Sequence, residues 1–194
     1  SDGTSKWKVV NSSASGLSAG AVTALHLSGA ALGARTGMLN GTIVESHASN
    51  AVTFALKTLS GSNPTSGDPV SFIFQTGAGG YVLRQVTGAL SITVPSGATL
   101  GAPTPTRVRI LALDNGGTVE LAVYNSVKSS MGLLRIDEAL PYTTTAISGS
   151  ATAAWTIYSA NARTLKYFVN IGFADFGTGV TPGTWNASPA AIVL

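Results

Sequence analysis

Apolar and polar side chains alternate in short runs along most of the chain between Ile43 and Ala174. Alternation with a period of two is the pattern of a β-strand that buries one face. It is clearest on two neighbouring arms, with apolar side chains at Val108, Ile110, Ala112, Val119, Leu121 and Val123. The pair Asn115-Gly116 stands between these arms and supplies the positive φ angles that a tight turn requires. We therefore predict an antiparallel hairpin over residues 106–125 that turns at Asn115-Gly116.

Further runs rich in β-branched and aromatic residues are separated by Gly, Pro, Ser and Asn. We expect strands at residues 41–47, 51–59, 69–75, 81–87, 89–94, 106–113, 118–125, 132–136, 152–158 and 164–173. The segments between them at 60–69, 76–80 and 95–105 have the composition of turns. This spacing favours an all-β fold, an antiparallel, jelly-roll-like β-sandwich of about ten short strands, over alternating strands and helices.

The N-terminal segment departs from this pattern, since residues 16–34 are rich in Ala and Leu. Two interpretations stay open, a short helix after Ser18 and extended chain along the domain. Gly20 and Gly29 would each cost about 1 kcal/mol inside a helix. We therefore divide the chain into a connecting segment at 1–37, in which Trp7 is the anchoring residue, and a β-sandwich head domain at 38–194.

The composition points to a protein of an unusual kind. The 194 residues fit one domain, of which 10% are charged and 44% hydrophobic, and 23 residues are glycine. An average soluble domain has about 25% charged residues. Serine, threonine, asparagine and glycine must therefore make the surface polar, which suits extracellular and virion proteins that pack many copies side by side.

The 11 basic and 8 acidic residues are scattered, and the net charge is +3. Nucleic-acid binding needs clustered basic residues. The nearest approach is Arg107 with Arg109 on one face of a predicted strand, which we interpret as solvated side chains. No apolar run reaches the ~18 residues of a membrane span, so we predict neither a nucleic-acid partner nor membrane insertion. Because the chain starts at Ser1 and not at methionine, we expect it to be the C-terminal part of a longer protein.

Residues for catalysis and metal binding are few. There is no cysteine, and the two histidines, His26 and His47, lie near no nucleophile motif. Glu45, Glu120 and Asp175 are the candidates for a pair of carboxylates that would hydrolyse a glycoside, and we favour a structural role for all three. The sequence thus predicts no enzyme, metal or cofactor.

Aromatic residues offer candidates for carbohydrate recognition, because sugar rings stack on exposed aromatic planes. We interpret Trp155 as a core residue and Trp185 as a plug that packs the C-terminal segment onto the sandwich, and we expect exposure at Tyr142 and Tyr158. The candidate glycan contacts are Tyr142, Tyr158, Trp185, Asn161 and Asn186.

The segment NAVTFALKTLSGSNPTSGDPVSFIF at residues 50–74 resembles a recurrent domain of tail-fibre-like and spike-like proteins of tailed phages and prophages. Its motifs here are Ala55-Leu56-Lys57, Gly61-Ser62-Asn63-Pro64 and Asp68-Pro69. Similar proteins also have the hairpin at 107–125 and a tail like residues 183–194. The resemblance covers about residues 38–194, and its motifs carry fold information and no catalytic content.

The resemblance implies a homotrimeric bacteriophage virion appendage, a tail fibre or head spike, with a β-sandwich head. Its partners would be host cell-surface polysaccharide and, through the N-terminal segment, other virion proteins. Two alternatives stay open, a virion decoration or capsid-associated protein without a receptor role and a tailspike-type polysaccharide-degrading enzyme. Because the basic residues are dispersed, we expect attachment to depend little on salt.

Overall fold

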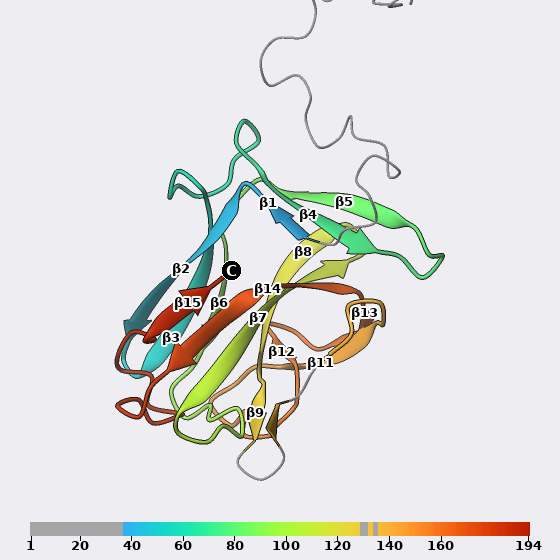
Figure 1. The fold of residues 1–194 in the computed structure, drawn as a ribbon. Helices are drawn as coiled ribbons and strands as arrows, with labels where there is room; N and C mark the ends of the chain where they lie inside the picture. The colour runs from blue at the N-terminus through green and yellow to red at the C-terminus, as the bar shows by residue number, and fades with distance from the viewer. Residues whose placement is uncertain (1–36, 129–131, 134–135) are drawn as a thin grey trace, which may run out of the picture.

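The computed structural model describes residues 37–128, 132–133 and 136–194, and these form β-strands joined by turns and loops (Figure 1). Within these ranges there is no helix. The prediction of an all-β sandwich is confirmed. The helix considered after Ser18, Trp7 and all of the connecting segment except Gly37 lie outside the described residues.

The larger sheet contains seven strands in the order β13-β11-β12-β8-β7-β14-β15. Their bounds are β7 (Thr106–Asn115), β8 (Thr118–Asn125), β11 (Tyr142–Ala146), β12 (Tyr158–Ser159), β13 (Arg163–Lys166), β14 (Phe168–Phe176) and β15 (Ala191–Val193). Strands β11 and β12 pair in parallel, and the other neighbours are antiparallel. The long strands β8, β7 and β14 form the centre of this sheet.

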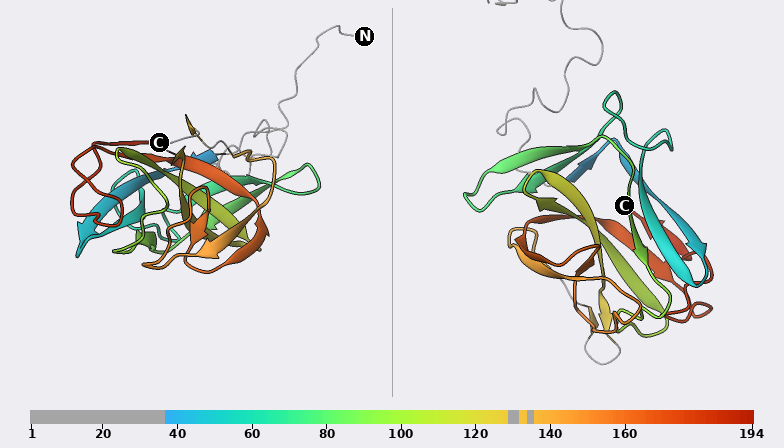
Figure 2. Two further views of the ribbon diagram at one scale, coloured as in Figure 1. Left: turned by 90° about the horizontal axis from the view of Figure 1, so that it is seen from below. Right: turned by 180° about the vertical axis from the view of Figure 1, so that it is seen from behind.

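The other layer consists of two three-stranded sheets (Figure 2). One has the order β2-β3-β6 and the other β1-β4-β5. The bounds are β1 (Gly37–Leu39), β2 (Gly41–Ala48), β3 (Ala51–Thr58), β4 (Val70–Gln75), β5 (Tyr81–Val86) and β6 (Leu90–Val94), and a short hairpin adds β9 (Val127–Lys128) and β10 (Gly132–Leu133). Asn40 joins β1 to β2 with a φ of 58°, and its side-chain amide donates to Asp68 Oδ1 at 2.7 Å.

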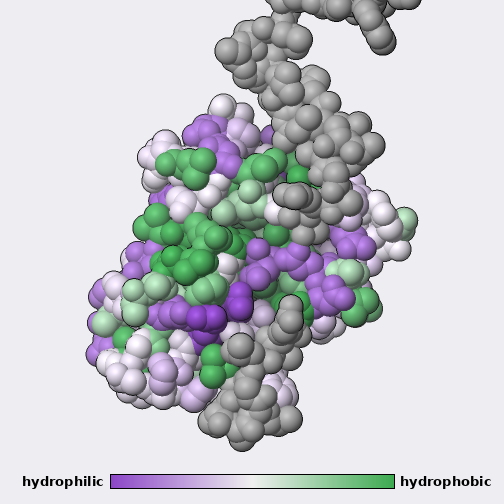
Figure 3. Space-filling model, viewed as in Figure 1, coloured by the Kyte–Doolittle hydropathy of each residue, from purple (hydrophilic) through white to green (hydrophobic). Residues whose placement is uncertain are grey.

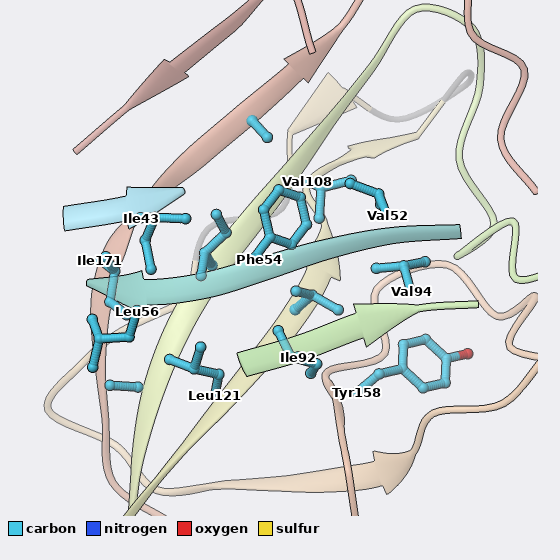
Figure 4. Close-up of a cluster of buried hydrophobic side chains, with 14 of the residues drawn as sticks. Ile43, Val52, Phe54, Leu56, Ile92, Val94, Val108, Leu121, Tyr158 and Ile171 are labelled. Carbon is cyan, nitrogen blue, oxygen red and sulfur yellow. The ribbon is translucent and has the colours of Figure 1, made fainter. Parts of the chain in front are cut away.

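The main core lies between these layers. In Figure 4, Phe54 and Leu56 of β3 and Ile92 of β6 project toward side chains of the larger sheet such as Val108 and Leu121. All of them are buried. Period-two alternation in β3 and β6 places every second side chain in this core, as the sequence predicts.

A second, smaller cluster lies on the other face of the larger sheet. Its buried members are Leu111, Leu113, Ala122, Tyr124, Ile157 and Phe168. Ile136 and Tyr142 pack against them, and the rings of Tyr142 and Phe168 meet edge to face with centroids 5.4 Å apart. The centre of the larger sheet is therefore apolar on both faces over part of its length.

The predicted hairpin forms, but its turn lies one residue later than expected. Asn115 is the last residue of β7 and pairs with Thr118, which leaves Gly116 and Gly117 as the two turn residues with φ of 63° and 109°. Two glycines adopt positive φ more readily than asparagine and glycine. Asp114 Oδ1 accepts a hydrogen bond from Gly117 N at 2.9 Å, which fixes this register.

The largest error concerns the segment between β10 and β14. The strand predicted at 152–158 is wrong except for Tyr158, since the chain turns near Trp155, which has a φ of 61° and is half-buried, not in the core as expected. Strand β11 (Tyr142–Ala146), rich in threonine, was not predicted. The strand predicted at 164–173 is divided, with β13 before Tyr167 and β14 after it.

Candidate functional site

The outer face of the larger sheet carries a cluster of ionic and aromatic side chains on β7 and β14, which we call the arginine face: Arg107, Arg109, Phe173 and Asp175. Arg107 and Arg109 are two residues apart on one strand and share a face, as predicted. Antiparallel pairing places Asp175 opposite Arg107 and Phe173 opposite Arg109. The sheet itself therefore assembles the cluster from residues far apart in the sequence.

Arg107 is held by Asp175 in a bidentate ion pair. Its Nε donates to Oδ1 at 2.6 Å and its Nη2 to Oδ2 at 2.7 Å. The hydrogen bonds that Arg107 donates to Asp175 are the main reason why the pKa of Arg107 is raised. The guanidinium carbon also lies 3.9 Å from the ring centre of Phe173. Asp175 and Phe173 thus hold Arg107 in one orientation.

Arg109 stands in a different electrostatic environment. Its guanidinium carbon lies 4.9 Å from the same Phe173 ring centre, and Tyr124 is its cross-strand neighbour on β8. Burial raises the pKa of the Tyr124 hydroxyl, and the positive charge of Arg109 acts against this shift. Among the described residues, Arg109 forms no ion pair, whereas the other three arginines there each bind a carboxylate.

An open pocket of about 460 Å³ lies beside the arginine face. Arg107 and Asp175 form part of its wall. The remaining lining residues are Pro105, Thr106, Val127, Phe176, Gly177 and Ala190. The pocket therefore combines mostly apolar walls with one fixed ion pair.

The three carboxylates considered for glycoside hydrolysis lie in different places. Glu120 lies on β8 opposite Leu113, and Asp175 lies on β14 opposite Arg107. Six residues of β7 separate these positions, or about 20 Å at the rise of a β-strand. Paired catalytic carboxylates of glycosidases are about 5 to 10 Å apart. Glu45 belongs to the other layer, on β2, and contacts His47 Nδ1 at 3.1 Å.

Glu120 is bound to Arg163 in a bidentate ion pair, at 2.9 Å from Nε and 2.6 Å from Nη2. The Arg163 hydrogen bonds lower the pKa of Glu120 below its usual value, and Asn115 contributes a further hydrogen bond. The pair links β8 to β13 at the far end of the larger sheet. This arrangement gives Glu120 a structural role.

Two of the predicted glycan contacts are buried. Tyr158 is only 3% exposed, so the expectation of an exposed ring is wrong. The reason is that β12 lies inside the larger sheet, between β8 and β11, and directs the ring into the main core (Figure 4). Its hydroxyl accepts a hydrogen bond from Ala153 N at 3.1 Å.

Trp185 is fully buried, which confirms its interpretation as a plug. Its Nε1 donates to Ala98 O at 3.0 Å, and its ring meets Phe176 edge to face with centroids 5.0 Å apart. The backbone N of Trp185 also donates to Asn50 O at 3.1 Å. The indole therefore fastens the C-terminal segment to the sandwich and presents no plane to a sugar.

The other three predicted contacts stay at the surface but lie on separate elements. Tyr142 is half-buried on β11, and its hydroxyl accepts from Asp137 N at 3.3 Å. Asn161 is exposed between β12 and β13, and exposed Asn186 follows Trp185 in the C-terminal segment. Asn161 and Asn186 thus stand in different loops, and the Tyr142 ring packs against Phe168 at the smaller cluster.

Sequence reasoning found one part of the arginine face and missed the rest. The spacing of Arg107 and Arg109 identified their shared face. Phe173 and Asp175 became part of it only through the pairing of β14 with β7. Asp175 follows Arg107 by 68 residues, and no local pattern indicates this contact.

The sequence matches no protein-family model, and neither the curated proteins nor the solved structures include a match to it. In the part of the chain that the structure describes, no three His, Asp or Glu side chains gather as a metal site would require. The same part contains no helix with the length and apolarity of a membrane span.

Proposed function

We propose that this chain forms the β-sandwich head of a bacteriophage virion appendage, a tail fibre or head spike. In this proposal the head self-associates as a homotrimer on the virion and contributes, without catalysis, to attachment to host-surface polysaccharide. The resemblance of residues 50–74 and the low-charge composition support the proposal, and the surface of the sandwich supports its self-association.

The supporting observation is a set of exposed apolar side chains on or beside the edge strands β1, β2 and β15, which we call the apolar edge: Leu39, Val44, Val193 and Leu194. Val44 is 45%, Val193 46% and Leu194 53% exposed. Strands β2 and β15 lie at the same side of the molecule in Figures 1 and 2, and Figure 3 shows hydrophobic atoms gathered over them. Both are edge strands of their sheets, with backbone groups available for pairing. Large apolar surfaces at such edges mark contacts between proteins.

The segment that carries the resemblance has a structural use here. Lys57 Nζ donates to Asn63 Oδ1 at 2.6 Å, and Thr58 N donates to Ser62 O at 2.9 Å. These contacts close the loop after β3 before the chain enters β4. The Ala-Leu-Lys and Gly-Ser-Asn-Pro motifs therefore act together to turn the chain, which supports reading them as fold signatures.

The carboxylates support a role without catalysis. Asp175 and Glu120 are each held by an arginine, and they are about 20 Å apart. Carboxylates so arranged serve to hold strands together. A tailspike-type hydrolase would need two of them facing one bond.

Sedimentation of the purified chain at micromolar concentration tests the self-association. We expect a trimer, and we expect Val44→Glu to shift it toward monomer because the charge would be buried at the contact. Leu165→Glu is the matched control, since Leu165 is 62% exposed on β13, at the opposite end of the larger sheet from β15. A wild-type chain that sediments as a monomer would contradict the proposal.

A polysaccharide array tests the attachment. Binding without release of reducing ends is the expected result. Release of reducing ends would instead support the polysaccharide-degrading alternative, and absence of any binding would support a decoration protein without a receptor role.

A further inference from the structure

We propose that the pocket beside Arg107 binds an acidic sugar, and that Arg109 pairs with the anionic group of that sugar. This inference rests on the proposed attachment to polysaccharide and names the class of glycan and the place where it binds. The pocket takes the sugar ring, while the carboxylate or phosphate of the sugar lies over the arginine face.

The arginine face carries one more positive than negative charge, since Arg107 and Arg109 share the single carboxylate of Asp175. Arg107 and Arg109 lie over one aromatic ring, and Asp175 neutralises only Arg107. Every other arginine in the described ranges has a carboxylate partner. The residues outside those ranges include a single acid, Asp2. Arg109 is therefore a cation that an external carboxylate or phosphate can bind with paired hydrogen bonds.

The arginine face is also preorganised. Its side chains stand on β7 and β14, which pair along most of their length. The Phe173 ring supports both guanidinium groups, and the Asp175 carboxylate fixes one of them. A ligand that binds here orders few side chains, so little of its interaction energy is lost to conformational entropy.

The adjoining pocket matches the chemistry of a sugar. Its volume of about 460 Å³ falls within the range of small-ligand sites. Val127, Pro105 and Ala190 offer apolar walls for the C–H face of a ring. The Asp175 carboxylate accepts hydrogen bonds from hydroxyls, and Arg107 retains Nη1 donors, because its pair with Asp175 uses Nε and Nη2. An inorganic anion alone would make no contact with these apolar walls.

The surface around the site is consistent with access from solvent. Figure 3 shows strongly hydrophilic atoms over β7 and β14, beside the hydrophobic atoms over β15. Arg107, Arg109 and Phe173 are each partly exposed.

The burial of Tyr158 and Trp185 removes two of the aromatic planes that neutral sugars would need. Recognition through charge then replaces the stacking that the sequence suggested, and binding should weaken as salt rises.

The test uses the purified full chain and a panel of bacterial polysaccharide fragments. The panel contains fragments with uronic acids, each beside its carboxyl-reduced form, and fragments with phosphate esters, each beside its dephosphorylated form. We expect at least one acidic fragment to bind and its neutral form to bind about tenfold more weakly, the loss typical of one charge-assisted contact. Which treatment removes the binding identifies the anionic group. This comparison changes only the ligand, so it does not depend on the folding of a variant.

Three variants locate the site. Arg109→Gln should lose about tenfold in affinity for the acidic fragment, as the neutral form does. Ala190→Phe, which fills the pocket, should weaken binding as well. Lys57→Gln is the matched control, because it removes the same charge from the opposite layer, and its affinity should equal that of the wild type. Thermal unfolding of each variant checks that it is folded.

The outcomes separate this inference from the proposed function. Binding to neutral fragments that Arg109→Gln leaves unchanged would overturn the acidic-sugar site and retain the attachment to polysaccharide. Binding to no fragment at all would overturn both.

Discussion

The two halves of strand β7 have opposite surroundings on the outer face of the sheet. In the first half, Arg107 and Arg109 are partly exposed and face solvent beside Phe173. In the second half, Leu111 and Leu113 are fully buried under the smaller cluster. On the inner face, both halves contribute apolar side chains to the main core, at Val108, Ile110 and Ala112. One strand thus changes from covering a core to separating two cores.

The sequence RVRILAL at residues 107–113 indicates this difference between the two halves of β7. Alternation of arginine with apolar residues marks the half with one buried face, and the run Ile110-Leu111-Ala112-Leu113 marks the half with two. A continuous apolar run requires cover on both faces, which Ile136, Tyr142 and Ile157 provide. The open half of the strand is where ligand chemistry is available, because nothing apolar among the described residues covers its arginines.

Leu111→Ala should have the largest effect. Leu111 is fully buried on the outer face, and its removal should lower the free energy of unfolding by about 2 to 5 kcal/mol, the cost of a cavity in a core. Urea unfolding measures this loss. A loss below about 1 kcal/mol would mean that the smaller cluster is not a second core and that the halves do not differ.

The Arg107–Asp175 pair should contribute less. Both side chains are about one-third exposed, at 32% and 33%, so solvent screens their attraction. A double-mutant cycle with Arg107→Gln and Asp175→Asn should give a coupling of about 0.5 to 1 kcal/mol. A coupling as large as the effect of Leu111→Ala would show that the open half is stabilised as strongly as the covered half.

Glu120 should give the covered half a dependence on pH. The Arg163 hydrogen bonds lower the pKa of Glu120 in the folded state. Its stabilising contribution is therefore complete above the pKa of the unfolded chain and is lost as the pH falls through the folded pKa. We expect the wild type to lose more unfolding free energy than Glu120→Gln between about pH 6 and about pH 3.

Arg163→Gln removes the largest cause of the lowered Glu120 pKa and should also reduce the pH dependence of stability. Equal pH dependence in the wild type and in both variants would show that this ion pair does not contribute to stability.

Local patterns were sufficient for the regular part of the fold. Strands β2 to β8 were predicted to within a few residues, because alternation and glycine-rich turns are properties of neighbouring positions. The hairpin turn was misplaced by one residue, since Asn115-Gly116 and Gly116-Gly117 both fit a two-residue turn. Cross-strand pairing of Asn115 with Thr118 decided between them.

The features that local sequence patterns did not predict depend on pairing between strands that are far apart in the sequence. The threonine-rich β11 became a strand because β12 and β13 pair with it on its two sides. Tyr158 was expected at the surface, and its position between β8 and β11 placed it in the core. The arginine face likewise depends on the pairing of β14 with β7. The sequence pattern of β7 indicates the two arginines, and it gives no sign of the residues that β14 contributes.

Arg109→Gln should have the smallest effect on stability. Its only contact among the described residues, apart from packing, is the Phe173 ring, and such a contact at a partly exposed site contributes about 0.5 to 1 kcal/mol. Removing the charge also relieves repulsion from Arg107, which offsets part of that loss. We therefore expect a decrease in unfolding free energy below about 0.5 kcal/mol, smaller than that of Arg107→Gln, measured by urea unfolding of both variants in parallel. A large loss would mean that Arg109 holds the sheet together and is not available for a ligand. A small loss, combined with weaker binding of the acidic fragment, would separate the binding role of Arg109 from the structural role of Arg107 two residues away.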